Sequence, residues 1–154
     1  MGFTVHGLWP QYEQGYPQYC STDERDPSRR ENAAMADIMA SPGLAAHQWR
    51  KHGRCTGLSA GRYFHLIRAA AGLVAIPESL TRGSGGARLT VDEVKHKVRA
   101  ANPDMPADGM VVQCQSGMLT ELRFCLTRDL EPRSCGIDLH DRCGSGRINM
   151  YPPR

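Results

Sequence analysis

HQWRKHGRC, residues 47–55, is the most informative segment of this 154-residue chain. If the segment is helical, with about 100° between successive residues, the side chains at positions 47, 48, 51 and 52 fall within an arc of about 140°. Two imidazoles, an amide and an ammonium group would then share one helix face. Neighbouring cations repel each other, so this face brings no obvious benefit to folding. It suits an anionic substrate whose charge grows in a transition state, and phosphate is the natural candidate.

A phosphodiester can be cleaved without a metal when a base and an acid act on opposite sides of the phosphorus atom. Imidazole can take either role near neutral pH. His6, in the segment FTVHGLWP at residues 3–10, could supply the partner from a distant part of the sequence. His65, His96 and His140 stand alone on the predicted surface, and we expect no chemical role for them.

Two histidines on one helix can also hold zinc, so this alternative has to be weighed. Zinc proteases place their histidines at positions i and i+4 and use a glutamate as general base. His47 and His52 are at i and i+5 instead, and the cationic Lys51 lies between them. The spacing therefore favours chemistry without a metal, and the sequence indicates no other cofactor.

Cysteine content and net charge narrow the class of protein. Six cysteines at spacings unlike zinc knuckles predict disulfides, with buried free thiols as the alternative. Disulfides persist in oxidising compartments, so we expect a periplasmic or extracellular protein. A net charge of +3 is too small to indicate a nucleic-acid partner by itself, and no apolar run is long enough to span a membrane.

The order of the predicted elements indicates an α+β fold in a single domain, residues 1–154, with an antiparallel sheet flanked by helices and stapled by disulfides. Strands are predicted at 3–9, 110–113, 119–126 and 148–151, with a hairpin turn at Ser116-Gly117. Helices are predicted at 31–39 with Pro42-Gly43 as the stop, at 44–51, after a Ser59 cap, and up to about 101 behind the capping box of Thr90 and Glu93. Residues 83–86, GSGG, are expected to form a surface loop.

The segments at residues 3–10 and 47–55 are similar to the two signature segments of the ribonuclease T2 family. The likeness extends through the loop to Cys20 and to the C-terminal cysteines, whereas residues 62–107 match only in helical character. The resemblance implies an α+β fold and base-tolerant cleavage of single-stranded RNA. In that reaction the 2′-hydroxyl attacks its own phosphate to give a 2′,3′-cyclic phosphate, which is then hydrolysed to a 3′-phosphate. DNA lacks this nucleophile and is expected to survive.

Carried over position by position, the resemblance implies a role for each residue of the cluster. His52 would be the base that takes the 2′-hydroxyl proton, and His6 would be the acid that protonates the 5′-oxygen. His47 would hold the phosphate. Lys51 would neutralise the charge of the pentacovalent transition state, which agrees with the shared helix face derived above.

The aromatic and cysteine positions follow the family in the same way. Trp9 and Tyr12 or Tyr16 resemble a base-stacking platform, and packing beside the strand end is the alternative for Trp9. Trp49 points away from the catalytic face and is expected to serve packing. The family pattern implies three disulfides, namely Cys20 with Cys55, Cys114 with Cys143, and Cys125 with Cys135.

Gln48 departs from the family, which usually has a glutamate at this place in the catalytic set. An amide can hydrogen-bond a phosphate oxygen, but it cannot share a proton or raise the pKa of a neighbouring imidazole. We therefore expect slower turnover, and Gln48→Glu should raise activity or move its pH optimum. The start departs too, because only five residues precede His6, and we expect a family strand to be missing through truncation, at a cost in stability.

A relative that keeps the fold but only binds RNA or signals is the alternative function, and Gln48 and the short start favour it. Two imidazoles suited to opposed roles, His6 and His52, favour catalysis, since a binding protein needs charge and stacking but no acid and base. The expected partner is single-stranded RNA. No membrane partner is expected, and the protein is expected to be a monomer.

Overall fold

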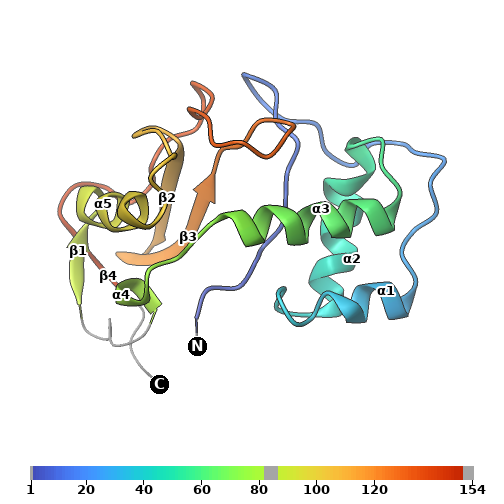
Figure 1. Ribbon diagram of the computed structural model, residues 1–154, viewed down its shortest axis with the longest axis horizontal. Coiled ribbons are helices and arrows are strands. Elements are labelled where there is room, and N and C mark those ends of the chain that lie inside the picture. The colour runs from blue at the N-terminus through green and yellow to red at the C-terminus, as the bar shows by residue number, and fades with distance from the viewer. Residues whose placement is uncertain (1, 82–86, 151–154) are drawn as a thin grey trace. The chain divides into compact units, whose positions relative to one another are not determined.

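The strands lie in the C-terminal part of the chain, whereas helices occur in both parts of the described residues. The computed structural model describes residues 2–81 and 87–150. By their contacts these fall into two units, one formed by residues 4–74 and the other by residues from 75 onward together with the first residues of the chain. Among the described residues, the first unit holds helices α1 to α3, and the second holds α4, α5 and strands β1 to β4 (Figure 1). The α+β class predicted from the sequence is confirmed.

Serine caps begin the α-helices of the first unit, which are α1 (Arg29–Ala34), α2 (Pro42–Lys51) and α3 (Ala60–Leu73). The short 3-10 helix η1 (Gly53–Cys55) follows α2 and has no side-chain cap. The side chains of Ser28, Ser41 and Ser59 each accept a hydrogen bond from a backbone N–H of the first turn that follows. The predicted Ser59 cap is therefore confirmed.

The prediction for the first helix is wrong at both ends. α1 begins earlier, at Arg29, because Ser28 and Glu31 form a capping box, and it ends at Ala34. Pro42, predicted as a stop, is instead the first residue of α2. Proline suits this position because its missing N–H would have no partner in the first turn and its φ is already helical.

The opening segment, residues 3–10, was predicted to contain a strand at 3–9, and this prediction is wrong. Its β-structure is one isolated parallel bridge between Val5 and Met39, where the Val5 N–H donates to the Ile38 oxygen at 2.9 Å. The Tyr63 hydroxyl donates to the Leu8 oxygen at 2.7 Å and holds the segment to α3. Strand-like residue types make a strand only where a partner strand supplies a continuous ladder, and here one bridge and one side chain take its place.

The core of the first unit lies between α2, η1 and α3. Trp49 and Tyr63 are fully buried, and their ring centroids are 6.0 Å apart. A Cβ atom at Gly53 would lie 2.6 Å from Tyr63 Cδ1, so only glycine fits where the chain leaves α2. Phe64 and Ile67 of α3 belong to the same core cluster.

The second unit is built on a mixed sheet. Its described elements are α4 (Glu78–Thr81), β1 (Arg88–Thr90), α5 (Val91–Ala101), β2 (Met110–Gln115), β3 (Met118–Phe124) and β4 (Arg147–Asn149). The strand order is β1-β4-β3-β2. The prediction of an antiparallel sheet holds for β1 with β4 and for β2 with β3, but β4 runs parallel to β3, so it is wrong for the sheet as a whole.

Local signals in the second unit agree with the structure more closely. The hairpin turns at Ser116 and Gly117, with φ values of 52° and 75°, the double positive φ of a type I′ turn. Thr90 and Glu93 form the predicted capping box of α5. The predicted final strand is present as β4. Tyr151, at the end of that prediction, and the predicted loop at residues 83–86 lie outside the described residues.

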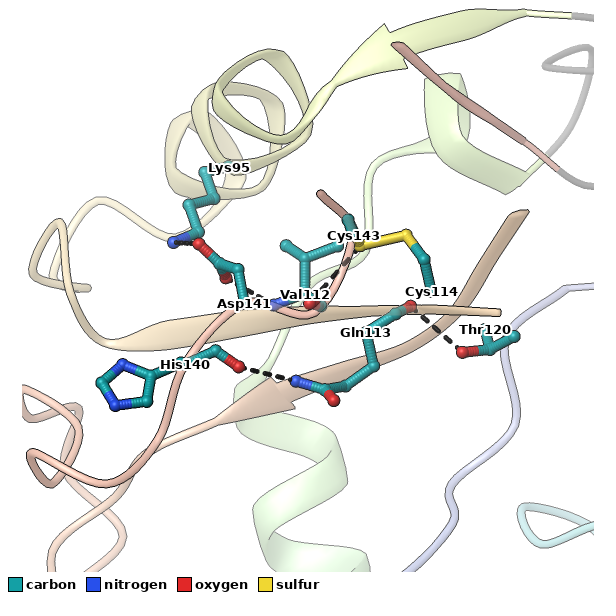
Figure 2. Close-up of a disulfide and its surroundings, with 8 residues drawn as sticks. All are labelled: Lys95, Val112, Gln113, Cys114, Thr120, His140, Asp141 and Cys143. Atoms are coloured by element: carbon teal, nitrogen blue, oxygen red, sulfur yellow. Dashed lines mark hydrogen bonds and ion pairs between the residues drawn. A yellow bond between two sulfur atoms is a disulfide. The ribbon is translucent and has the colours of Figure 1, made fainter. Parts of the chain in front are cut away.

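A disulfide fixes the C-terminal segment to the hairpin. Cys114 of β2 is bonded to Cys143 (Figure 2). Beside it, Asp141 accepts hydrogen bonds from the Val112 N–H and from the Lys95 ammonium of α5, both at 2.8 Å (Figure 2). Sheet, helix and C-terminal segment of this unit are therefore cross-linked at one place.

The other disulfides join Cys20 to Cys55 in the first unit and Cys125 to Cys135 in the second. All three pairs are those that the family resemblance implied. By the usual scale each bridge contributes about 2–4 kcal/mol to stability. No helix in the described parts of the chain has both the length and the apolar character needed to cross a membrane.

Candidate active site

His52 lies at the end of α2, in the first unit. The helix ends at Lys51, and His52 is its C-cap residue, with φ −122° and ψ −42°. The helix-face argument therefore holds for His47, Gln48 and Lys51, whereas the backbone of His52 leaves the helix. Its N–H still donates to the Gln48 oxygen at 2.9 Å. Its side chain is buried, with 3% of the residue's surface exposed.

The His52 ring is covered by aromatic side chains from the opening segment and from the loop that follows it. The Trp9 indole stacks on it, with the centroids 5.1 Å apart and the planes 24° from parallel. Tyr16 lies 6.3 Å away in a tilted arrangement. The Nδ1 atom of His52 is buried and has no hydrogen-bond partner in the described structure. This ring is therefore screened from water without being locked by a hydrogen bond at Nδ1.

Burial and neighbouring cations keep His52 neutral. Burial is the main cause that lowers the pKa of His52 from 6.5 to about 4, and the positive charges of Lys51, His47 and His6 lower it further. Lys51, His47 and His6 are thus three groups whose charges act on the His52 imidazole. At neutral pH His52 is an uncharged imidazole that can accept a proton.

His6 lies on the exposed side of the same aromatic cluster. Its ring meets the Trp9 indole edge to face, with centroids 5.6 Å apart and planes at 73°. Trp9 thus contacts both predicted proton-transfer residues, His6 and His52. His6 is exposed, whereas His52 is buried, so the two imidazoles stand in different environments.

Gln48 points at Trp9. Its side-chain oxygen accepts a hydrogen bond from the Trp9 indole N–H at 2.6 Å, and only 2% of the residue's surface is exposed. Gly7 lies against this pair, because a Cβ atom there would be 2.7 Å from both Gln48 Cδ and Trp9 Nε1. The close approach of the backbone explains the glycine within the opening segment.

The two predicted tyrosines are placed differently. Tyr16 reaches the His52 ring, as described above. Tyr12 is 64% exposed, and its N–H donates to the Gly15 oxygen in a turn. The structure therefore brings Tyr16 to the cluster and leaves Tyr12 on the surface of the loop.

The sequence analysis missed Asp26, whose carboxylate contacts Trp49 of α2 and Arg54 of η1. One of its carboxylate oxygens accepts from the Arg54 guanidinium at 2.7 Å and from the Trp49 indole at 2.9 Å. These two donors hold the pKa of Asp26 below its usual range. The expectation that Trp49 serves packing agrees with its buried position. A single aspartate in a long polar loop carries no local signal of this role.

The loop that follows the opening segment also holds the C-terminal end of α2. The Tyr19 N–H donates to the Lys51 oxygen at 2.8 Å, next to the Cys20–Cys55 disulfide. Tyr19 adopts a left-handed backbone conformation, with φ 51°, to do so. The end of the helix that carries Lys51 and His52 is therefore fixed by a backbone bond and a covalent bridge.

The buried His52 is expected to make stability depend on pH. Its folded pKa of about 4 is below 6.5, so as the pH falls the unfolded chain takes up the proton first. The free energy of unfolding should therefore decline as the pH falls through 6.5 toward about 4. The Arg25 guanidinium and the capping-box bonds lower the pKa of Glu31 to about 2, so such carboxylates lose their contribution only at pH values below their ordinary pKa of 4.5.

Urea unfolding of the wild type and of His52→Gln between about pH 7 and pH 5 measures this effect. The wild type should lose stability across this range more steeply than the variant. Equal slopes in the two proteins would contradict the buried, neutral state of His52.

Across residues 2–81 and 87–150, no group of three or more His, Cys, Asp or Glu side chains is arranged to hold a metal ion.

Known proteins share both the sequence pattern and the fold. A ribonuclease from Aeromonas hydrophila is 36% identical over 115 residues, which is 75% of this chain and 46% of that protein. The intracellular ribonuclease LX of Solanum lycopersicum is 38% identical over 78 residues, 40% of this chain and 31% of that protein. The chain thus spans less than half the length of these curated relatives.

Solved structures resemble the fold as well, including the following two. An RNase-related protein from Calystegia sepium has a TM-score of 0.74 at 20% identity, with 97% of this chain and 82% of that chain covered. RNase NT in complex with 5′-AMP has a TM-score of 0.72 at 22% identity, with 99% and 84% covered. The model of the ribonuclease T2 family matches residues 1–135. Since this match takes in both signature segments and all of the contacts around His52, the chain belongs to the ribonuclease T2 family.

Proposed function

We propose that the protein is an endoribonuclease that cleaves single-stranded RNA through the 2′-hydroxyl of the substrate. The observation that carries the proposal is the pairing of a buried neutral imidazole, His52, with an exposed imidazole, His6, both of which contact the Trp9 ring. Two titratable groups in different environments suit the opposed roles of base and acid. The family membership supports the same reaction class.

In the first step His52 accepts the proton of the 2′-hydroxyl. The freed oxygen forms a bond to the adjacent phosphorus, and the bond from phosphorus to the 5′-oxygen breaks. The exposed His6, in its protonated form, gives its proton to that leaving oxygen. The products are a 2′,3′-cyclic phosphate and a free 5′-hydroxyl, so protons and bonds balance within the step.

The cations around His52 would serve the phosphate. Lys51 and His47 lie on one face of α2 and act electrostatically on His52. A phosphate bound among them would offset their mutual repulsion, and the Lys51 ammonium would stabilise the charge that builds up on the pentacovalent phosphorus. The anion would also raise the pKa of His52 and improve its strength as a base.

The second step uses the same groups in reverse. Water takes the place of the 5′-hydroxyl, His6 removes its proton, and His52 returns a proton to the 2′-oxygen. The cyclic phosphate opens to a 3′-phosphate. Neither step calls for a metal, because acid, base and charge stabilisation all come from side chains.

Aromatic side chains support low base specificity. Trp9 and Tyr16 lie at the cluster, and Tyr12 is exposed nearby in sequence. Stacking on an aromatic ring accepts every base and contributes about 1–3 kcal/mol per base. The complex of RNase NT with 5′-AMP shows that a protein of similar fold binds a nucleotide.

The three disulfides support a periplasmic or extracellular location, where such bonds persist.

A fluorescent single-stranded RNA and the matching DNA, each with and without EDTA, test the function. We expect RNA cleavage that EDTA does not reduce, a 2′,3′-cyclic end that later becomes a 3′-phosphate, and intact DNA. RNA that is bound by the folded protein but not cut at any pH between about 4 and 8 would favour the alternative, a binding or signalling relative.

A further inference from the structure

Gln48 is linked to His52 in two ways, directly through its backbone and indirectly through Trp9. Its backbone oxygen accepts the His52 N–H at 2.9 Å. Its side-chain oxygen accepts the Trp9 indole N–H at 2.6 Å, and that indole stacks on the His52 ring. One residue of α2 therefore holds both the backbone of His52 and the aromatic side chain that covers its imidazole.

The amide of Gln48 is enclosed at this place. The residue is buried, and the backbone of Gly7 passes so close that even a methyl group there would collide with both Gln48 and Trp9. A Gln48 side chain that reached for a phosphate oxygen would have to leave this bond and expose the indole N–H. The packing around Gln48 therefore favours the hydrogen bond to Trp9 over a contact with substrate.

We propose that Gln48 is a positioning residue, whose amide oxygen holds the Trp9 indole over His52 and so maintains the dry surroundings in which His52 acts as base. The inference rests on the proposed function and deepens it. It differs from the sequence expectation, in which Gln48 belonged to the catalytic set and its amide could hydrogen-bond a phosphate oxygen. Here it acts on the reaction through Trp9.

The groups that face His52 make the consequence measurable. Lys51 and His47 from α2 and His6 from the opening segment act on it as cations, and the Trp9 and Tyr16 rings screen it from water. Burial is the largest cause of its lowered pKa. If the Trp9 indole loses its hydrogen bond to Gln48 and moves, water reaches the His52 ring. The pKa of His52 should then rise from about 4 toward 6.5.

Gln48→Met tests the bond, because methionine has nearly the same length and volume but offers no strong acceptor. We expect kcat for a dinucleotide to fall about tenfold or more, with a smaller change in KM, since His52 is misplaced while the phosphate site is kept. NMR titration of the histidines should show the pKa of His52 rising. The exposed His65→Gln on α3 is the matched control and should change neither value.

Trp9→Phe completes the cycle, because phenylalanine keeps a ring over His52 but has no N–H for Gln48. In this background Gln48→Met should have almost no further effect on kcat or on the pKa of His52. Full additivity of the two substitutions, or a loss of kcat with the pKa of His52 unchanged, would overturn the proposal and place Gln48 on the substrate.

Gln48→Glu separates the effect of the hydrogen bond to Trp9 from the effect of charge at position 48. A carboxylate can accept the same indole bond, so the Trp9 N–H should stay protected from solvent exchange, and the added anion should raise the pKa of His52 and shift the pH optimum upward. Loss of that protection would count against the inference even if Gln48→Met failed to fold. The NMR results do not depend on RNA cleavage, so a wild type that cleaves no RNA would refute the proposed function while the positioning role is still decided.

Discussion

Replacing His52 with alanine is expected to lower kcat for RNA cleavage by about 10²–10⁴-fold, the usual contribution of a positioned general base. The imidazole is neutral at pH 7 because its pKa is about 4, so the wild type has its base ready over the whole neutral range. The variant has no group at this position that can take the 2′-hydroxyl proton. The rate of 2′,3′-cyclic phosphate formation from a short RNA measures the loss.

His6→Ala provides the companion measurement. His6 is exposed, so its removal should leave the melting temperature nearly unchanged and still reduce kcat by a similar factor. His96→Ala, on the exposed face of α5, is the control for general effects of losing an imidazole. If the His6 and His52 variants both kept more than a tenth of the wild-type rate, the acid and base assignments would be wrong.

The second large effect concerns stability. Trp49→Ala should lower the free energy of unfolding by about 3–5 kcal/mol, because it empties the centre of a packed core. Trp49 is fully buried beside Tyr63, and its indole N–H donates to Asp26 at 2.9 Å. The same helix carries His47 and Lys51, so loss of this packing should also make activity disappear at a lower temperature. Urea unfolding measures the change.

Two further variants separate packing from hydrogen bonding at this place. Trp49→Phe keeps a ring in the core but cannot donate to Asp26, so it should cost less than the alanine variant. Leu73→Ala, at an exposed position on α3, should change stability by no more than about 0.5 kcal/mol. A Trp49→Ala protein as stable as the Leu73→Ala protein would show that the core of this unit does not depend on the indole.

Much of the local structure could be read from the sequence because its causes are local. The Ser59 cap and the box of Thr90 and Glu93 satisfy backbone N–H groups within one turn, and Ser116-Gly117 supplies the positive φ values of the hairpin. Where two local signals compete, the sequence pattern does not decide between two helix boundaries. Pro42 can end one helix or begin the next, and the cap at Ser41 decided for the second.

Pairings between distant residues could not be read in the same way. β1 and β4 are three residues long, and neither has a partner close in the sequence, so β1 was missed and the parallel contact of β4 with β3 was not expected. The opening segment has strand-forming residues but only one bridge, at Val5. Sheet membership depends on a neighbour whose position is decided by the whole fold.

For the candidate site, the sequence alone determined the chemistry that is available. The spacing of His47, Lys51 and His52 indicated a cationic cluster, and the two signature segments indicated His6 as its partner. Only the tertiary structure decided that His52 is buried beneath Trp9 and that Gln48 faces the indole. The physical reason is that residue types specify which protons and charges a chain can offer, whereas burial, and with it the pKa of His52, depends on side chains that come together only on folding.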